Sequence, residues 1–314
     1  MKKELHLLGN KCVLFFFLFL LAQKSYSQLG PIDGGFTIGP SNFLGDLGGN
    51  YGKGTGFLKD NNFSQTRVLL GLHLTANPNE FLSIRLGANY GMISGDDAVI
   101  RGKGGLEEAR LIRNLNFKSK IKEAFIAAEI FPLVFLEEDP TDTWHKLRPY
   151  GVVGVGVFNF NPMGQDPSNG NWIYLKNLRT EGQGFPEYPD RKEYKLTAVN
   201  FPVGFGVKYF ASDNMSISME IIHRFTTTDY VDDVSTTYID RNLFYAHLPL
   251  NQAILADRLH DKSGSSVNRN AGDKRGTATN NDGYYSVGLK ASFRIGGNGD
   301  RSFRNSTRCP VMRY

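Results

Sequence analysis

Eight segments of the chain alternate apolar and polar residues, and the links between these segments are alternately short and long. Residues 284–295 show the alternation best: apolar side chains occupy the odd positions from Tyr285 to Ile295, and small or polar side chains occupy the even positions from Ser286 to Arg294. A β-strand places alternate side chains on opposite faces. One face would meet lipid and the other a polar interior, which is typical of a barrel in an outer membrane.

This pattern predicts an all-β fold, an eight-stranded antiparallel transmembrane β-barrel with short periplasmic turns and long extracellular loops. The expected strands span residues 35–44, 65–76, 81–93, 116–131, 148–158, 196–211, 215–227 and 284–295. The links 77–80 and 212–214 are tight turns, whereas 45–64, 94–114, 159–193 and 229–282 are long and polar. Outer-membrane barrels keep short turns on the periplasmic side, so both termini are expected there.

Two features depart from the simple pattern. In the fourth expected strand, Lys118, Lys120 and Lys122 occupy even positions, so they face the side opposite to Glu123. We expect a bulge near Glu123 that lets the apolar residues of 124–128 face lipid. The link 132–147 is long for a periplasmic turn, which makes it a candidate periplasmic contact, with an ordinary insertion as the alternative.

The ends of the chain are expected to lie outside the barrel. Residues 1–27 combine lysines, an apolar run and small residues before Gln28, which predicts a cleaved signal peptide and export to the cell outer membrane. Removing them would lower the formal net charge from +5 to +2, because they hold four lysines and one glutamate. The expected domains are therefore a signal peptide (1–27), the barrel (28–295) and a basic periplasmic tail (296–314). Cys309 in that tail is either a free thiol or paired with another chain.

The polar faces of the expected strands carry charges of both signs. Eight strands make a narrow barrel whose interior is filled by side chains, and buried charges must be paired to be tolerated. A plug of ion pairs meets this requirement better than a substrate path, which would favour one sign. The residues expected in this lumen plug are Arg85, Glu123, Lys208, Glu220, Lys290 and Arg294, with Glu129 as a further candidate.

Other functions have weak support. The histidines after the signal segment are scattered singly, and none lies in a nucleophile motif, so we expect no enzyme activity. Asp96 and Asp97, or Asp229 with Asp232 and Asp233, could offer carboxylates to calcium, but their spacing fits no fixed ligand pattern, so we expect no metal and no cofactor. The basic tail lacks interleaved aromatics, so nucleic acid is not an expected partner. Residues 105–114 and 250–259 could form short helices in the loops.

Three segments are similar to a known family. Residues 39–47, 86–97 and 113–119 resemble the outer-membrane β-barrel family of Bacteroidota that includes PorG of the type IX secretion system, and weaker matches run to residue 295. The family-motif positions in these segments are Asn42, Gly45, Asp46, Gly95, Asp96, Asp97, Asn114 and Phe117.

The resemblance implies a non-enzymatic barrel that anchors or caps the periplasmic ring of the secretion and gliding machinery. Its partners would be outer-membrane lipids, ring-forming periplasmic lipoproteins and, during insertion, the barrel-assembly machinery. The periplasmic contact would then involve Glu137, Glu138, Asp139 and Trp144 in the 132–147 link, and Arg301, Arg304, Arg308 and Cys309 in the tail. The alternative is a small OmpA/OmpW-like surface barrel whose long outer loops bind a ligand or partner.

Overall fold

The computed structural model describes residues 31–48, 63–100, 107–136, 146–212, 214–264 and 269–295. In these parts of the chain eight long antiparallel strands close into a barrel, because β3 pairs with β4 as well as with β2. The barrel strands are β1 (Ile32–Leu44), β2 (Arg67–Ala76), β3 (Leu82–Asp96), β4 (Asn116–Ile130), β5 (Leu147–Asn159), β8 (Thr197–Ser212), β9 (Met215–Thr226) and β10 (Gly283–Ile295). The expected fold is confirmed, and each expected strand corresponds to one of these.

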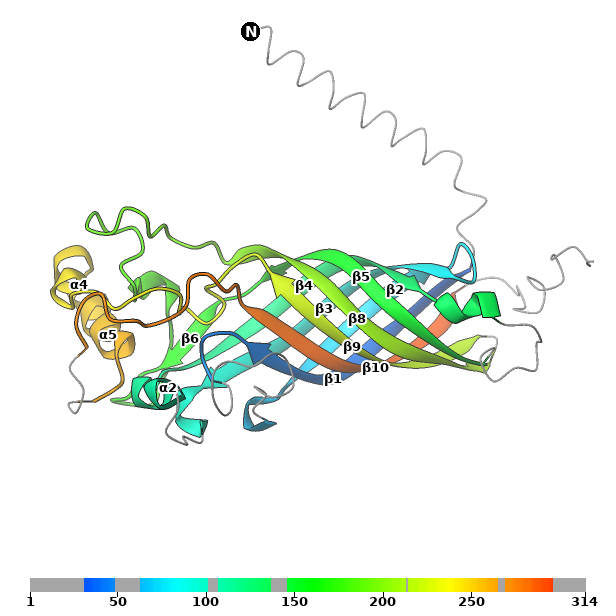
Figure 1. Ribbon diagram of the computed structural model, residues 1–314, viewed down its shortest axis with the longest axis horizontal. Helices are drawn as coiled ribbons and strands as arrows, with labels where there is room; N and C mark the ends of the chain where they lie inside the picture. The colour runs from blue at the N-terminus through cyan, green and yellow to red at the C-terminus, as the bar shows by residue number, and fades with distance from the viewer. Residues whose placement is uncertain are drawn as a thin grey trace, which may run out of the picture.

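The two ends of the barrel differ in the way the strands are connected. The short turns, the start of β1 and the end of β10 lie at one end of the barrel, and the long links lie at the other (Figure 1). By the rule for outer-membrane barrels the first is the periplasmic end and the second the outer end. The expected signal peptide (1–27) and basic tail (296–314), with the contact residues assigned to the tail, lie outside the described residues. So does the stretch 137–145 with Glu137, Glu138, Asp139 and Trp144.

The barrel wall is apolar outside and polar inside. Leu72 is 70% exposed and Phe205 is 63% exposed, and they belong to rows of exposed aliphatic and aromatic residues on every barrel strand. Such a continuous apolar surface is stable only against lipid. The chain is thus an outer-membrane β-barrel. One expectation for this face was wrong: Tyr285 is buried, and its hydroxyl accepts a hydrogen bond from the Asn42 side-chain amide at 3.3 Å.

The expected bulge in β4 is also absent. The pairing of β4 with β3 runs unbroken from Asp96–Asn116 to Leu82–Ile130. Lys118, Lys120 and Lys122 therefore share the outward face with Ala124, and the inward face carries Ser119 and Ile121, both completely buried. No bulge is needed, because the lysines continue the outward row beyond its apolar part.

The long links form a folded layer over the outer end, which we call the outer cap (Figure 1). It contains α2 (Glu107–Arg113), α4 (Asn242–His247), α5 (Leu250–His260), the short strands β6 (Pro162–Gln165) and β7 (Trp172–Tyr174), and the 3-10 helices η1 (Phe63–Gln65), η2 (Asp97–Val99) and η4 (Lys176–Leu178). Another short element, η3 (Pro132–Leu136), lies at the periplasmic end. Helices α2 and α5 match the two expected loop helices, whereas α4, β6 and β7 were not expected.

The cap has its own hydrophobic core. Phe244 of α4 and Ala253 and Ala256 of α5 are completely buried against Leu178 and Phe185. A second apolar cluster, including Phe117, Phe158 and Tyr284, fills the outer mouth of the barrel itself. No helix in the described parts of the chain is long and apolar enough to cross a bilayer.

Candidate functional site

A network of ion pairs fills the middle of the lumen, with Glu129 at its centre. The Glu129 carboxylate is completely buried and accepts hydrogen bonds from Lys208 Nζ at 3.0 Å and Lys290 Nζ at 2.5 Å. Arg85 Nε lies 3.4 Å from the same carboxylate. These groups come from β3, β4, β8 and β10, so the network crosses the lumen and ties facing walls together.

A second carboxylate extends this network. Glu220 on β9 accepts two hydrogen bonds from Arg85 Nη1, at 2.8 and 3.0 Å, and a third from the Tyr150 hydroxyl at 2.8 Å. Lys290 Nζ lies 3.6 Å from the Glu220 carboxylate. The network therefore contains three cations and two carboxylates, each with a partner of opposite sign.

Nearer the outer end Glu123 forms a separate cluster. Its carboxylate accepts from Arg224 Nε at 2.9 Å and from the side-chain amides of Asn89 and Asn200, both at 2.6 Å. Arg224 also donates to the Ser286 hydroxyl at 3.0 Å. This cluster lies directly below the apolar cluster of the outer mouth, since Asn200 also donates to Tyr284, a member of that cluster.

Five of the six residues expected in the lumen plug thus lie inside the barrel. Arg294 instead lies at the periplasmic end, where Nε is 3.6 Å from Asp33 Oδ1. The sequence reasoning missed Arg224 and Arg148, which are also buried. Strand parity could have found both, since Arg224 shares the parity of Glu220. The buried and paired side chains of these clusters occupy the middle of the lumen.

At the periplasmic end the barrel has a small, partly open hollow of about 40 Å³. Arg148 Nη2 lies 3.3 Å from Glu80 Oε2, and the Asn77 amide donates to Asp33 at 2.8 Å. Three of the lining side chains are cationic and two are anionic. The lining residues are Asp33, Asn77, Asn79, Glu80, Ser83, Phe131, Arg148, Lys208, Phe210 and Arg294. We call this hollow the periplasmic pocket.

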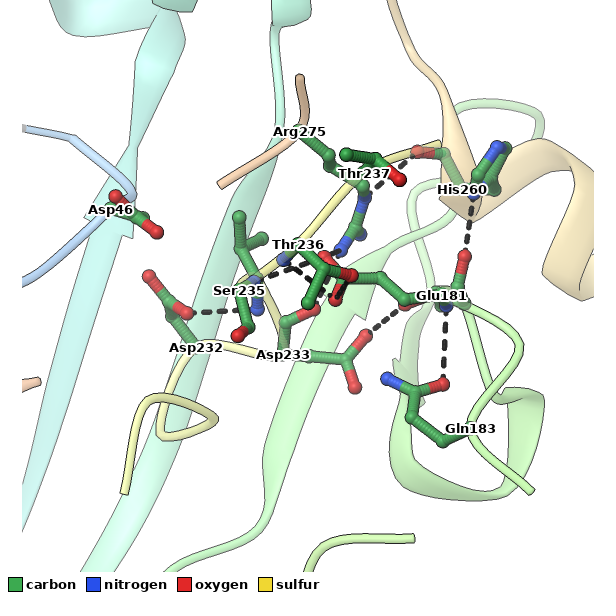
Figure 2. A network of polar contacts seen from close by, with 12 residues as sticks. Asp46, Glu181, Gln183, Asp232, Asp233, Ser235, Thr236, Thr237, His260 and Arg275 are labelled. Atoms are coloured by element: carbon green, nitrogen blue, oxygen red, sulfur yellow. Dashed lines mark hydrogen bonds and ion pairs between the residues drawn. The ribbon is translucent and has the colours of Figure 1, made fainter. Parts of the chain in front are cut away.

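At the outer end two buried arginines hold the four long links together. Arg113, at the end of α2, donates to Asp97 at 2.8 and 3.0 Å, and to the backbone oxygens of Asp46 and Arg275, both at 2.6 Å. Arg275 donates to Glu181 at 2.8 Å and to the backbone oxygen of Asp233 at 2.7 Å. Figure 2 shows Arg275 pointing at Glu181 between Thr236 and the end of α5. Each long link thus contributes to one network.

Beside this network lies a group of four aspartates that we call the acid cluster: the half-buried Asp46 and the buried Asp229, Asp232 and Asp282. Figure 2 shows the carboxylates of Asp46 and Asp232 turned toward each other. Burial, followed by the charges of the neighbouring aspartates, raises the pKa of Asp282 well above its usual range. Burial is likewise the main cause that raises the pKa of Asp232 well above its usual range and the pKa of Asp229 to about 7. Burial therefore disfavours the charged form of each of these three carboxyls.

The family-motif residues meet at this outer end. Asp46 accepts from the Thr277 amide at 2.5 Å, and Asp97 accepts from the backbone amides of Gly48 and Leu115 at 3.0 and 3.2 Å. Asn42 Oδ1 accepts a hydrogen bond from the Thr66 hydroxyl. The ring of Phe117 packs edge-on against the ring of Phe43. Gly95 lies so close to Phe117 that a Cβ atom would come within 2.8 Å of the ring. Asp96 caps η2 through the Ala98 amide, and Asn114 has a positive φ of 54°.

Neither a catalytic nor a metal arrangement is evident in the described part of the chain. His73 Nε2 lies 2.9 Å from the Ser292 hydroxyl in the lumen, but within this part Nδ1 of His73 has no partner, so no acid orients the ring. No group of three or more His, Cys, Asp or Glu side chains in the described ranges has the geometry to hold a metal ion.

Solved structures that match this chain include outer-membrane and bacterial surface proteins. The attachment invasion locus protein Ail of Yersinia pestis, in complex with the heparin analogue sucrose octasulfate, is 8% identical over 84% of this chain and 99% of its own, with a TM-score of 0.34. Neisserial surface protein A is 8% identical over 84% and 96%, with a TM-score of 0.34. A major outer membrane protein from Thermus thermophilus is 11% identical over 84% and 99%, with a TM-score of 0.37. Nothing about the function of this chain follows from likenesses this distant.

The comparison with curated proteins gives no match. A family model described as "Domain of unknown function (DUF6089)" matches residues 10–247. The matched range includes the first seven barrel strands and the family-motif positions at the outer end. The chain therefore belongs to the DUF6089 family.

Proposed function

We propose that this barrel is a non-enzymatic anchor that holds a periplasmic partner at its periplasmic end, the PorG-like role in type IX secretion that the sequence resemblance implies. The observation that carries the proposal is the contrast between the two ends of the lumen. Ion pairs fill its middle and apolar side chains fill its outer mouth, whereas the periplasmic pocket is open. A filled barrel with one open, charged end suits attachment better than transport.

The charges of the periplasmic pocket favour a partner with an acidic side chain. Arg148, Lys208 and Arg294 outnumber Asp33 and Glu80 around the hollow. An incoming carboxylate could exchange with Glu80, whose contact with Arg148 is long at 3.3 Å and half-exposed on the acid side. The partner in this proposal is a ring-forming periplasmic lipoprotein, as the resemblance implies.

Site-specific crosslinking in native outer membranes tests the proposal. A photoreactive residue replaces Asn79, which lines the periplasmic pocket, and a matched one replaces Asn251, which is exposed on α5 of the outer cap. We expect Asn79 to crosslink to periplasmic lipoproteins and Asn251 to give no crosslink to them. Crosslinks from Asn251 alone would overturn the anchor role.

A second function is supported by the outer cap. Its helices rest on a hydrophobic core, yet Tyr245, Leu250 and Ile254 remain exposed on the same helices. A rigid layer with exposed apolar side chains suits a surface barrel that binds a partner outside the cell. The Asn251 crosslinker is the test of this function also, since it would then capture an extracellular partner.

A further inference from the structure

Three lysines stand in a row on the outside of the barrel wall. Lys118, Lys120 and Lys122 have the outward parity of β4, as the unbroken pairing with β3 requires. Lys120 and Lys122 are exposed, and Lys118 is half-buried. Because the inward positions between them are occupied by buried Ser119 and Ile121, none of the three side chains can serve the lumen network.

The row lies where the apolar band of the wall ends. Eight residues separate Lys122 from Ile130, the last outward residue of β4 at the periplasmic end. That is about 26 Å along the strand and about 20 Å along the barrel axis at a tilt of about 40°. Lys120 and Lys118 follow at about 25 and 30 Å along the axis. Since the apolar band of such barrels is about 25 Å tall, Lys120 and Lys118 lie at the outer headgroup level, and Lys122, about 5 Å lower, reaches it by extending its long side chain.

Neighbouring residues agree with this level. Tyr90, opposite Lys122 on β3, is 50% exposed, as expected for an aromatic residue at the membrane boundary. Above it β6 and β7 extend the wall from β4, and Trp172 of β7 lies under Lys118, with Nζ 4.0 Å from the ring centroid. Trp172 therefore orients the uppermost lysine of the row.

Within the described ranges, the row has no negative partner. The charges that act on Lys118 are those of Arg67 and Lys120, both positive. Among the described residues no carboxylate lies within ion-pair distance of Arg67, Lys118, Lys120 or Lys122. Like charges this close repel each other, so an anion lying against the row would stabilise it. Successive lysines are about 7 Å apart along the strand, which lets neighbouring pairs hold separate phosphate groups.

We propose that Lys118, Lys120 and Lys122 form a binding site for the phosphate groups of a phosphorylated glycolipid of the outer leaflet. The acyl chains of this lipid would lie against the apolar part of the same wall, below the lysines, on Ala124, Ile126 and Tyr90. The proposal concerns the lipid-facing wall and is independent of the partner bound at the periplasmic end.

The test compares lipid retained by two charge-matched variants. The site variant K118Q/K120Q/K122Q and the control variant K146Q/K192Q/K274Q each lose three exposed or half-buried lysines, but the control lysines lie elsewhere. Each barrel is extracted from native outer membranes in mild detergent, and phosphorylated glycolipid per barrel is measured by mass spectrometry and total phosphate. We expect the site variant to retain about tenfold less phosphorylated glycolipid per barrel, because it loses three weak contacts together, and we expect the control to retain as much as the parent chain. Equal retention by both variants would overturn the proposal.

Two further arms identify the source of the phosphate. Lipid-free barrels are incubated with micelles of the same glycolipid, with its enzymatically dephosphorylated form, or with the glycolipid plus excess inorganic phosphate. We expect binding only of the phosphorylated lipid, undiminished by inorganic phosphate. Equal binding of the dephosphorylated lipid, or full displacement by inorganic phosphate, would overturn a lipid-phosphate site. If the triple variant does not insert, K120Q and K122Q alone should each give a partial loss, and unchanged retention in both would count against the site.

Discussion

Replacing Glu129 by glutamine should destabilise the barrel more than any other single removal of a lumen charge. The carboxylate is completely buried and holds Lys208 at 3.0 Å, Lys290 at 2.5 Å and Arg85 at 3.4 Å. At about 3 Å one such contact amounts to about 5 kcal/mol of Coulomb attraction at an effective dielectric constant of about 20. Glutamine keeps the shape but leaves three buried cations sharing the single charge of Glu220. Removal of one partner of a buried pair costs about 3–5 kcal/mol, which is the loss we expect here.

The measurement is the free energy of unfolding in urea of the barrel reconstituted in vesicles. The matched control is Glu193→Gln, since Glu193 is half exposed in its pair with Arg179, and we expect it to cost at most about 1 kcal/mol. The double variant E129Q/K290M removes one charge of each sign and should cost about 1–3 kcal/mol less than the sum of its single changes. A loss below about 1 kcal/mol for Glu129→Gln, or additive single changes, would refute the assigned role of the network.

Three further predictions use other parts of the molecule. Leu72→Lys, in the lipid-facing wall, should cost about 2–4 kcal/mol in the same urea titration, whereas Leu72→Met should be nearly neutral. Gly204→Val should prevent barrel assembly, because a Cβ atom at this position would lie 2.1 Å from the backbone oxygen of Ile221. The measurement is the loss of the compact, fast-migrating form on unheated gels. The control is Gly151→Val, since a Cβ atom at Gly151 would have no atom within 4 Å. Asp229 has a folded pKa of about 7, above its ordinary value, so its contribution to stability is present below about pH 4 and is lost as pH rises through 7. Asp229→Asn should therefore remove up to about 1.4 kcal/mol per pH unit of the slope between about pH 5 and 7, measured by hydrogen exchange in the outer cap. The pKa of His260, lowered to about 3 by burial, works in the opposite direction, so only the difference between the variant and the parent chain is diagnostic.

The barrel could be predicted because every strand repeats one physical rule, with lipid on one side and a packed interior on the other. The same alternation placed Arg85, Lys208, Glu220 and Lys290 on inward faces, and the structure puts all four in one network. Where the rule was not applied fully, residues were missed. Arg224 has the parity of Glu220, and reading that parity to the end of β9 would have included it.

The outer cap could not be predicted in this way. Arg113, Glu181 and Arg275 come from three different links, and no period in the sequence relates them. Their contacts depend on where the barrel holds the ends of each link. Those positions are known only once the order of the strands around the barrel is known. The expected bulge in β4 failed for a different reason: three successive outward lysines were treated as incompatible with a lipid-facing row, although a row that passes the end of the hydrocarbon region can carry charge.

The seam between β1 and β10 determines when this wall can be completed during biogenesis. Asn42 on the first barrel strand lies beside Tyr285 on the last, 243 residues later in the chain. Until the final strand has been synthesised and exported, both outermost strands expose unsatisfied backbone groups, which invite pairing with other chains. A chain that stops before residue 283 would therefore be a sheet with two open edges, because the last strand is the one that pairs with both β1 and β9.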